Sequence, residues 1–137
     1  MIIKPPKAFP VGEPWRTEPL AELIDVGATI FDYAGVQPPS WMQGRSLRPV
    51  VEGRADYHRL YSISEFKQHT MIETQSLKCE FDPAGEALFL TNSARDPLEQ
   101  DNVARHPAYA RVLGTLKYLL IDHNKKTAQP WAIALAE

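Results

Sequence analysis

Four short segments with two-residue alternation, followed by one long amphipathic stretch, most constrain the fold of this chain. The segments are residues 59–66, 69–74, 77–81 and 86–91. Alternation with a period of two is typical of strands with one buried face. Short links join these segments, and short links favour antiparallel neighbours. We therefore predict a four-stranded antiparallel meander.

A helix that begins at Pro107 is predicted to cover one face of this meander. Proline suits the first turn of a helix, because its missing N–H would be unpaired there in any residue. Apolar side chains recur at helical spacing, and the stripe consists of Tyr109, Val112, Leu113, Leu116, Leu119, Leu120 and His123. The tail beyond the helix carries Trp131, Ile133 and Leu135, and we expect it to dock on the chain or on a second copy.

The first part of the chain is broken by proline. Residues 5–19 contain five prolines, each of which removes a backbone donor. A loop is therefore predicted there, between two short strands at residues 1–4 and 20–24. A domain rarely opens in this way, so we expect a large N-terminal part to be missing.

A helix is predicted over residues 25–34. Asp25 is placed as its N-cap, because a carboxylate there can accept hydrogen bonds from the free amides of the first turn. Gly35 can adopt the left-handed conformation that ends a helix. The apolar face is predicted to consist of Val26, Thr29, Ile30 and Tyr33. A single helical turn is expected within residues 46–51.

Composition narrows the class of protein. Apolar residues make up 44% and charged residues 23% of the chain, which is ordinary for a soluble globular protein. The net charge of -2 gives no reason to expect a nucleic acid or an anionic membrane as partner. No apolar run is long enough to span a bilayer, and the first residues do not resemble a signal peptide. Localisation stays open between cytoplasm and periplasm. The single cysteine, Cys79, is predicted to be a small buried hydrophobe.

Eight residues of the predicted helix and the loop after it form one sequence pattern. They are Asp25, Thr29, Asp32, Ala34, Gly35, Gly44, Ser46 and Leu47. Their pattern resembles a late segment of the sulfatases, sulfuric ester hydrolases of the alkaline-phosphatase-like superfamily, of the form D-x-x-P-T-x-x-D-x-A-G and then G-x-S-L. Ala28 replaces the usual proline, which is an easy exchange in a first helical turn.

The second half is similar to the same family. The similar positions are Ser64, Glu65, Met71, Lys78 and the D-P-x-E-x-x-N segment of residues 96–102. Departures occur at Glu73, where the family has arginine, at Leu77, where it has tyrosine, and at Leu90 and Thr91, where it has an Asp-Leu pair. The resemblance covers residues 1–123.

The resemblance implies an α+β fold: a strand–helix unit plus a four-stranded antiparallel sheet covered by a C-terminal helix, the C-terminal portion of a sulfatase α/β fold. Residues 1–56 would be the tail of the large α/β domain. Residues 57–137 would be the C-terminal antiparallel subdomain.

No catalytic, cofactor-binding or metal-binding residue is assigned in this chain. It lacks the family's C/S-x-P-x-R motif, whose Cys or Ser becomes formylglycine, and it has no Asp-Asp pair for a metal. Calcium is implied for the full-length parent only. Asp101 and Asn102 are expected to order a helix start. His58 and Arg59, at the mouth of the first strand, are the candidate residues at the rim of a substrate site.

The preferred interpretation is the C-terminal fragment of a sulfatase, non-catalytic alone, which completes the fold and forms one wall of the substrate cleft. Its partner would be the missing N-terminal catalytic portion, or a second copy through the exposed apolar helix face. The alternatives are a non-catalytic binding or oligomerisation module, or the same region of a related phosphatase or phosphonate hydrolase.

Overall fold

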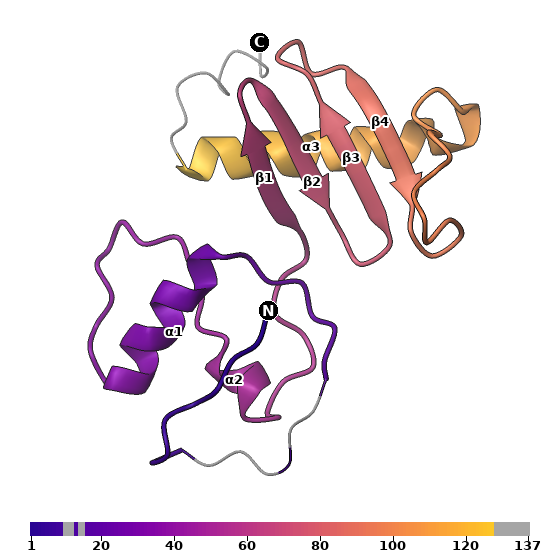
Figure 1. Ribbon diagram of the computed structural model, residues 1–137. Coiled ribbons are helices and arrows are strands. Elements are labelled where there is room, and N and C mark those ends of the chain that lie inside the picture. Colours follow the sequence, from indigo (N-terminus) through magenta and orange to yellow (C-terminus); the bar gives the residue numbers. More distant parts are fainter. Residues whose placement is uncertain (10–12, 14–15, 128–137) are drawn as a thin grey trace. The chain divides into compact units, whose positions relative to one another are not determined.

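A computed structural model of the chain describes residues 1–9, 13 and 16–127. The chain divides into two compact units, Met1–Leu60 and Tyr61–Glu137, which are treated separately below (Figure 1). The predicted docking of the tail around Trp131 lies outside the described residues.

The first unit contains two helices, α1 (Ile24–Ala34) and the single-turn α2 (Arg48–Val51). Gly35 ends α1 as predicted, with a φ of 66°, and its N–H and that of Val36 bond the carbonyls of Asp32 and Phe31. Only a residue without a side chain adopts this left-handed conformation at no cost.

The start of α1 differs from the prediction. Leu23 is the N-cap and makes no side-chain capping bond, whereas Asp25 lies inside the first turn. The Asp25 carboxylate is instead bound by groups distant in sequence, which are described below. The strands expected at residues 1–4 and 20–24 are also wrong, since the described part of this unit contains no strand.

The buried side of α1 agrees with the predicted apolar face only in part: Thr29 is buried, and Val26 and Tyr33 are partly buried. The buried residues are Asp25, Ala28 and Thr29. Ile30, placed on the buried face by the sequence, is 63% exposed, and Leu23 is 83% exposed. The helix therefore turns Asp25, Ala28 and Thr29 inward and leaves Leu23 and Ile30 on its outward side.

The second unit contains a meander in the order β1-β2-β3-β4, with every neighbouring pair antiparallel. The strands are β1 (Ser62–Phe66), β2 (His69–Glu73), β3 (Leu77–Phe81) and β4 (Ala87–Asn92). The predicted four-stranded sheet is confirmed. β1 begins three residues later than the alternation suggested, because Arg59 is bound within the first unit.

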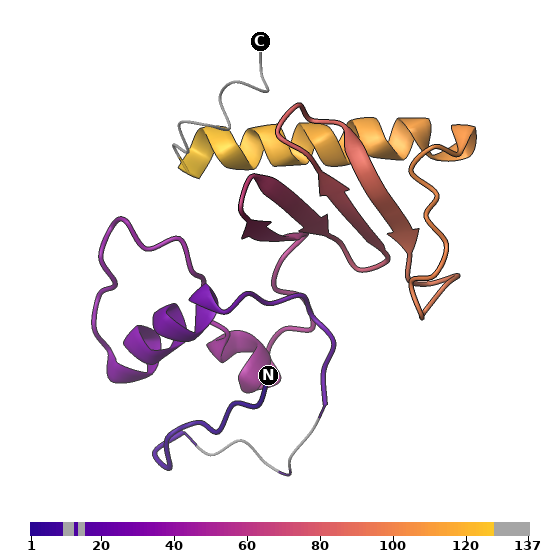
Figure 2. The ribbon, with the colours of Figure 1, turned by 45° about the horizontal axis from the view of Figure 1, so that its top comes forward.

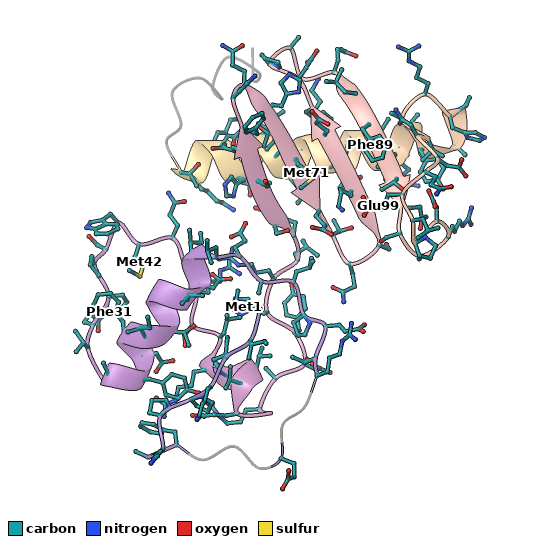
Figure 3. All side chains as sticks on the ribbon, in the orientation of Figure 1. Met1, Phe31, Met42, Met71, Phe89 and Glu99 are labelled. Carbon is teal, nitrogen blue, oxygen red and sulfur yellow. The ribbon has the colours of Figure 1, made fainter. Side chains whose placement is uncertain are left out.

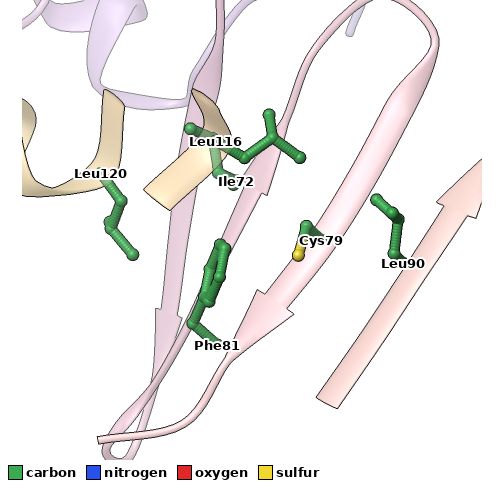
Figure 4. Packing of buried hydrophobic residues seen from close by; sticks show 6 residues of the cluster. All are labelled: Ile72, Cys79, Phe81, Leu90, Leu116 and Leu120. Carbon is green, nitrogen blue, oxygen red and sulfur yellow. The ribbon is translucent and has the colours of Figure 1, made fainter. Parts of the chain in front are cut away.

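The helix α3 (Ala110–Thr127) follows a short 3-10 turn, η1 (Pro107–Tyr109), and lies across one face of the sheet (Figures 1 and 2). Its Leu116 and Leu120 complete the buried cluster shown in Figure 4, whose other members are Ile72, Cys79, Phe81 and Leu90. The α+β architecture predicted from the sequence is confirmed, and Cys79 is fully buried as expected.

The segment of residues 96–102 does not order a helix start, which corrects the prediction. The Asn102 side chain accepts a hydrogen bond from the Leu90 amide (3.1 Å) and donates one to the Leu88 carbonyl (2.9 Å). The Val103 amide bonds the Leu90 carbonyl (2.8 Å). These bonds occupy backbone groups on the outer edge of β4, which a sheet otherwise leaves unpaired.

Candidate functional site

The polar residues of α1 that match the sulfatase pattern form a set of hydrogen bonds with the loop after the helix. The Arg45 amide donates to Asp25 Oδ1 (2.8 Å), and the Leu47 amide donates to Thr29 Oγ1 (2.8 Å). Ser46 Oγ donates to Asp32 Oδ2 (2.6 Å). We call these three bonds the α1 clasp. Asp25, Thr29 and Asp32 lie on one side of the helix because they are spaced by four and three residues.

Gly44 permits the close approach on which the clasp depends. A Cβ at this position would collide with the Ile24 carbonyl oxygen and lie 2.8 Å from the carbonyl carbon. Leu47, at the other end of the clasp, is 3% exposed. In the G-x-S-L pattern, the glycine therefore allows close contact with α1 and the serine donates a hydrogen bond to it. The leucine is buried.

Asp25 is the most heavily bonded residue of the site, and its side chain has no exposed surface. In addition to the Arg45 amide, its carboxylate accepts the Glu22 amide (2.9 Å), Arg59 Nε (2.8 Å) and Arg59 Nη2. His58 Nε2 lies 3.0 Å from Asp25 Oδ2. Arg59 Nη1 also pairs with Glu22 Oε2 at 2.7 Å. A buried charge is tolerated when it is paired and hydrogen-bonded in this way.

These contacts determine the ionisation of Asp25. Burial opposes the charged form, but the bonds from Arg59, Arg45, Glu22 and His58 outweigh burial and hold the pKa of Asp25 well below its usual value. The carboxylate is therefore ionised at neutral pH. A carboxylate with such a low pKa is a poor proton donor or acceptor at that pH, so the geometry indicates a structural anion.

A second ion cluster supports the other end of the clasp. Arg48 Nη1 lies 3.0 Å from Asp32 Oδ1, and Arg48 Nε lies 2.8 Å from Glu52 Oε1. The Arg48 guanidinium also stacks over the rings of Phe9 (4.5 Å) and Tyr33 (5.1 Å). This cluster connects α1, α2 and the N-terminal segment.

The two candidate rim residues, His58 and Arg59, are brought together at Asp25. Their side chains are 6% and 9% exposed. Sequence reasoning missed this partnership, because it identified Asp25 as a cap and the other two as surface groups. The pair lies more than thirty residues from Asp25 along the chain, a separation that no local pattern encodes.

The other polar residues singled out by the sequence are dispersed in the second unit. His69 pairs with Glu80 across β2 and β3 at 2.7 Å, and the His106 ring accepts the Ala108 amide. Burial raises the pKa of the Cys79 thiol to about 12, which leaves little thiolate at neutral pH. Lys78 pairs with Glu99 of the D-P-x-E-x-x-N segment at 2.5 Å.

Within the described residues, no three His, Cys, Asp or Glu side chains are grouped so that they could hold a metal ion. Asp25 and Asp32 are instead bound to arginines. In the same part of the chain, no helix combines the length and apolar character of a membrane-spanning segment.

Comparison with known proteins identifies the family. The family model described as N-sulphoglucosamine sulphohydrolase, C-terminal, matches residues 1–126. The chain belongs to this sulfatase family. The match contains the α1 clasp, the whole meander and nearly all of α3.

Individual relatives agree with membership of the sulfatase family. An N-acetylglucosamine-6-O-sulfatase of Bacteroides thetaiotaomicron is 30% identical over 92% of this chain and 25% of its own length. A protein solved in complex with its substrate D-glucosamine-2-N,6-O-disulfate is 28% identical, with a TM-score of 0.65 over 76% of this chain and 24% of that one. This member of the sulfatase family therefore spans about a quarter of the length of its relatives.

The same architecture occurs in a neighbouring hydrolase. A phosphonate monoester hydrolase of Silicibacter pomeroyi is 25% identical and has a TM-score of 0.68 over 80% of this chain and 26% of its own. The fold of this sulfatase-family chain is thus shared with a protein named as a phosphonate monoester hydrolase.

Proposed function

We propose that this chain is the C-terminal part of a sulfatase, in which it completes the fold and forms one wall of the substrate cleft. The hydrolysis of the sulfate ester is assigned to the preceding part of the protein, together with the formylglycine and the calcium that the family resemblance implies. This chain contributes no catalytic residue in the proposal.

The observation that carries the proposal is the set of exposed apolar side chains on the outward side of α1. Its charged residues, Asp25 and Asp32, are bound inside the unit by the clasp. Leu23, Ile24 and Ile30 form an outer stripe that is 83%, 50% and 63% exposed. A helix that is apolar on its outward side is typical of one buried in a larger structure.

We assign one occupant to this outer stripe, the large α/β domain of the sulfatase. Relatives are about four times as long as this chain, so the preceding domain has ample surface to cover α1. Self-association through the same stripe is the competing outcome, and it would support the oligomerisation module instead.

His58 and Arg59 remain the proposed rim residues. Because their polar groups are engaged with Asp25, the proposal gives them an indirect role: they hold the backbone of residues 57–60 in place, and that backbone shapes the rim. Names of the relatives point to a sulfated glucosamine as the substrate of the parent enzyme.

A phosphonate or phosphate ester is the second candidate substrate class. The Silicibacter pomeroyi hydrolase supports it, since that enzyme shares the fold at a similar level of identity. The two classes differ in the catalytic part of the protein, so substrate turnover by the complete enzyme separates them.

The reading frame upstream of Met1 tests the assignment. A sulfatase predicts C/S-x-P-x-R in that frame, and a stop codon with no such region would refute the proposal. The chain alone is expected to leave an arylsulfate unhydrolysed. Turnover by the chain alone that a chelator abolishes would show that it does carry catalytic residues.

A binding measurement with a control variant tests whether the large α/β domain covers the outer stripe of α1. The chain and the Leu23→Glu, Ile30→Glu double variant are each mixed with the upstream domain and analysed by light scattering. Complex formation by the chain and its loss in the double variant are expected. Tyr118→Glu, at an exposed position of α3, is the matched control and should still bind. If the chain forms only homo-oligomers, the oligomerisation module is favoured.

A further inference from the structure

The sheet of the second unit has a second face, away from α3, that the buried cluster does not use. Because side chains alternate between the faces of a strand, the row Ser64, Met71, Glu80 and Phe89 lies opposite the row Ile63, Ile72, Cys79 and Leu90. Figure 3 shows Met71 and Phe89 on the sheet with α3 behind it. A shallow depression lies on this outer face, lined by Ser64, Phe66, Lys67, His69, Met71 and Glu80.

The hairpin between β1 and β2 supplies an aromatic ring and a cation to this depression. Phe66 is 74% exposed at the end of β1. Lys67 follows it in the left-handed conformation, with a φ of 58°, and its ammonium lies 5.4 Å from the centre of the Phe66 ring. A non-glycine residue in this conformation is uncommon. The turn therefore presents the ring and the charge together.

The neighbouring strands supply a carboxylate. Glu80 Oε1 is 2.7 Å from His69 Nδ1, and the two side chains are 40% and 44% exposed. The other carboxylate oxygen of Glu80 has no partner among the described residues. In the register of the strands, Ser64, Met71 and Glu80 form one row across β1, β2 and β3, and His69 lies opposite Phe66 next to the hairpin.

We propose that this depression is a contact site for an amino sugar that carries a sulfate group. The inference rests on the proposed function, since it specifies which surface of this chain would face a substrate. An exposed aromatic ring can pack against the apolar C–H face of a sugar. Lys67 offers a point charge for the sulfate, and Glu80 offers an acceptor for an ammonium or hydroxyl group.

The opposite charges of Lys67 and Glu80 favour a ligand that carries both a positive and a negative group. A simple anion would be attracted by Lys67 but repelled by Glu80. A sugar with an ammonium group and a sulfate group on different carbons complements both. The depression has a volume of about 470 Å³, within the range of small-molecule sites, roughly 300–1,000 Å³.

The probe is D-glucosamine 6-sulfate, titrated into the 15N-labelled 137-residue chain and followed by the amide signals. Shifts are expected at residues 64–71 and at Glu80. Phe66→Ala and Lys67→Asn should each weaken binding by about fivefold or more, the size of one exposed cation–π or charge-assisted contact. Asparagine is chosen because it tolerates the left-handed conformation.

Matched variants remote from the depression are the controls. Tyr118→Ala removes a ring that is 68% exposed on α3, and Lys126→Ala removes a lysine from the same helix. Both should bind the probe as the parent chain does. Equal weakening by these variants would overturn the site, as would the absence of any shift at tens of millimolar probe.

Two further ligands sharpen the test. Unsulfated D-glucosamine should bind more weakly, because it lacks the group that Lys67 contacts. If inorganic sulfate alone reproduced the shifts and the affinity, the sugar contact would be refuted. A negative titration would refute this site alone, because the proposed function is tested by the upstream reading frame. The two proposals can therefore be refuted separately.

Discussion

The carboxylate of Asp25 accepts a hydrogen bond from the backbone amide of Arg45, at 2.8 Å and across twenty residues of sequence. Because the donor is a backbone group, the position of the loop does not depend on the side chain of residue 45. The same holds for the Leu47 amide and Thr29. The clasp thus constrains the backbone of the loop, while the pattern G-x-S-L leaves its second residue open.

Replacing Asp25 with asparagine should strongly destabilise the first unit. The change removes one of the two carboxylates that pair with the Arg59 guanidinium, which is 9% exposed, and leaves only Glu22. Breaking a buried ion pair costs about 3–5 kcal/mol. The free energy of unfolding by urea, followed through a probe in the first unit, measures the loss. Asp32→Asn is the control, because that carboxylate is 37% exposed and its loss should cost less. Equal losses in the two variants would argue against Asp25 as the main anchor.

Acid should destabilise the chain through Asp25. Its pKa is depressed in the folded state, so its contribution to stability is complete above the unfolded pKa of about 4 and falls as pH decreases below that value. Urea midpoints at a series of pH values between neutral and strongly acidic test this. In Asp25→Asn the decline below about pH 4 should be shallower. An unchanged slope would show that other carboxylates dominate the acid transition.

Replacing Gly44 with alanine should open the clasp. The new Cβ would meet the backbone carbonyl of Ile24, which no side-chain rotation can relieve. We expect a loss of about 1–3 kcal/mol, the usual cost of overpacking, with faster hydrogen exchange at the amides of residues 45 and 47. Gly114→Ala is the control: its Cβ meets nothing within 4 Å in the interior of α3, and it should be neutral or stabilising by up to about 1 kcal/mol.

Replacing Asn102 with alanine should loosen the edge of the sheet. The Leu90 amide would lose its acceptor and the Leu88 carbonyl its donor. An unsatisfied polar group in a partly buried position costs about 1–3 kcal/mol. Hydrogen exchange at Leu90 is the measurement, and Asn102→Asp should protect it partially, because aspartate keeps the acceptor. Unchanged protection in the alanine variant would indicate that the Val103 backbone bond is sufficient.

The sequence predicted best what local patterns encode. Alternation located four strands to within a few residues, and the spacing of Leu116 and Leu120 predicted the side of α3 that packs on the sheet. The glycine stop at Gly35 followed from the left-handed conformation, which glycine adopts without steric cost. Each of these features depends on neighbours within one or two turns.

Features that depend on distant partners were not predictable in this way. Asp25 was identified as a cap because a carboxylate before an apolar run usually caps. Of the groups bonded to its carboxylate, only the Glu22 amide is local, and the others belong to residues 45, 58 and 59. The inward side of α1 was misassigned in part, at Ile30, for a related reason. Asp32 is bonded to Ser46 in the loop and to Arg48, whereas Ile30 is exposed.

The loop of residues 36–43 lies between two fixed points, the left-handed Gly35 and the closely packed Gly44. The contacts at these two glycines therefore hold the ends of the loop, whatever the number of residues between them. The entropy of closing a loop grows only slowly with the number of residues in it. Insertions and deletions between these glycines should then be tolerated more readily than in the clasp itself, so this loop is a suitable place to graft a label or an epitope.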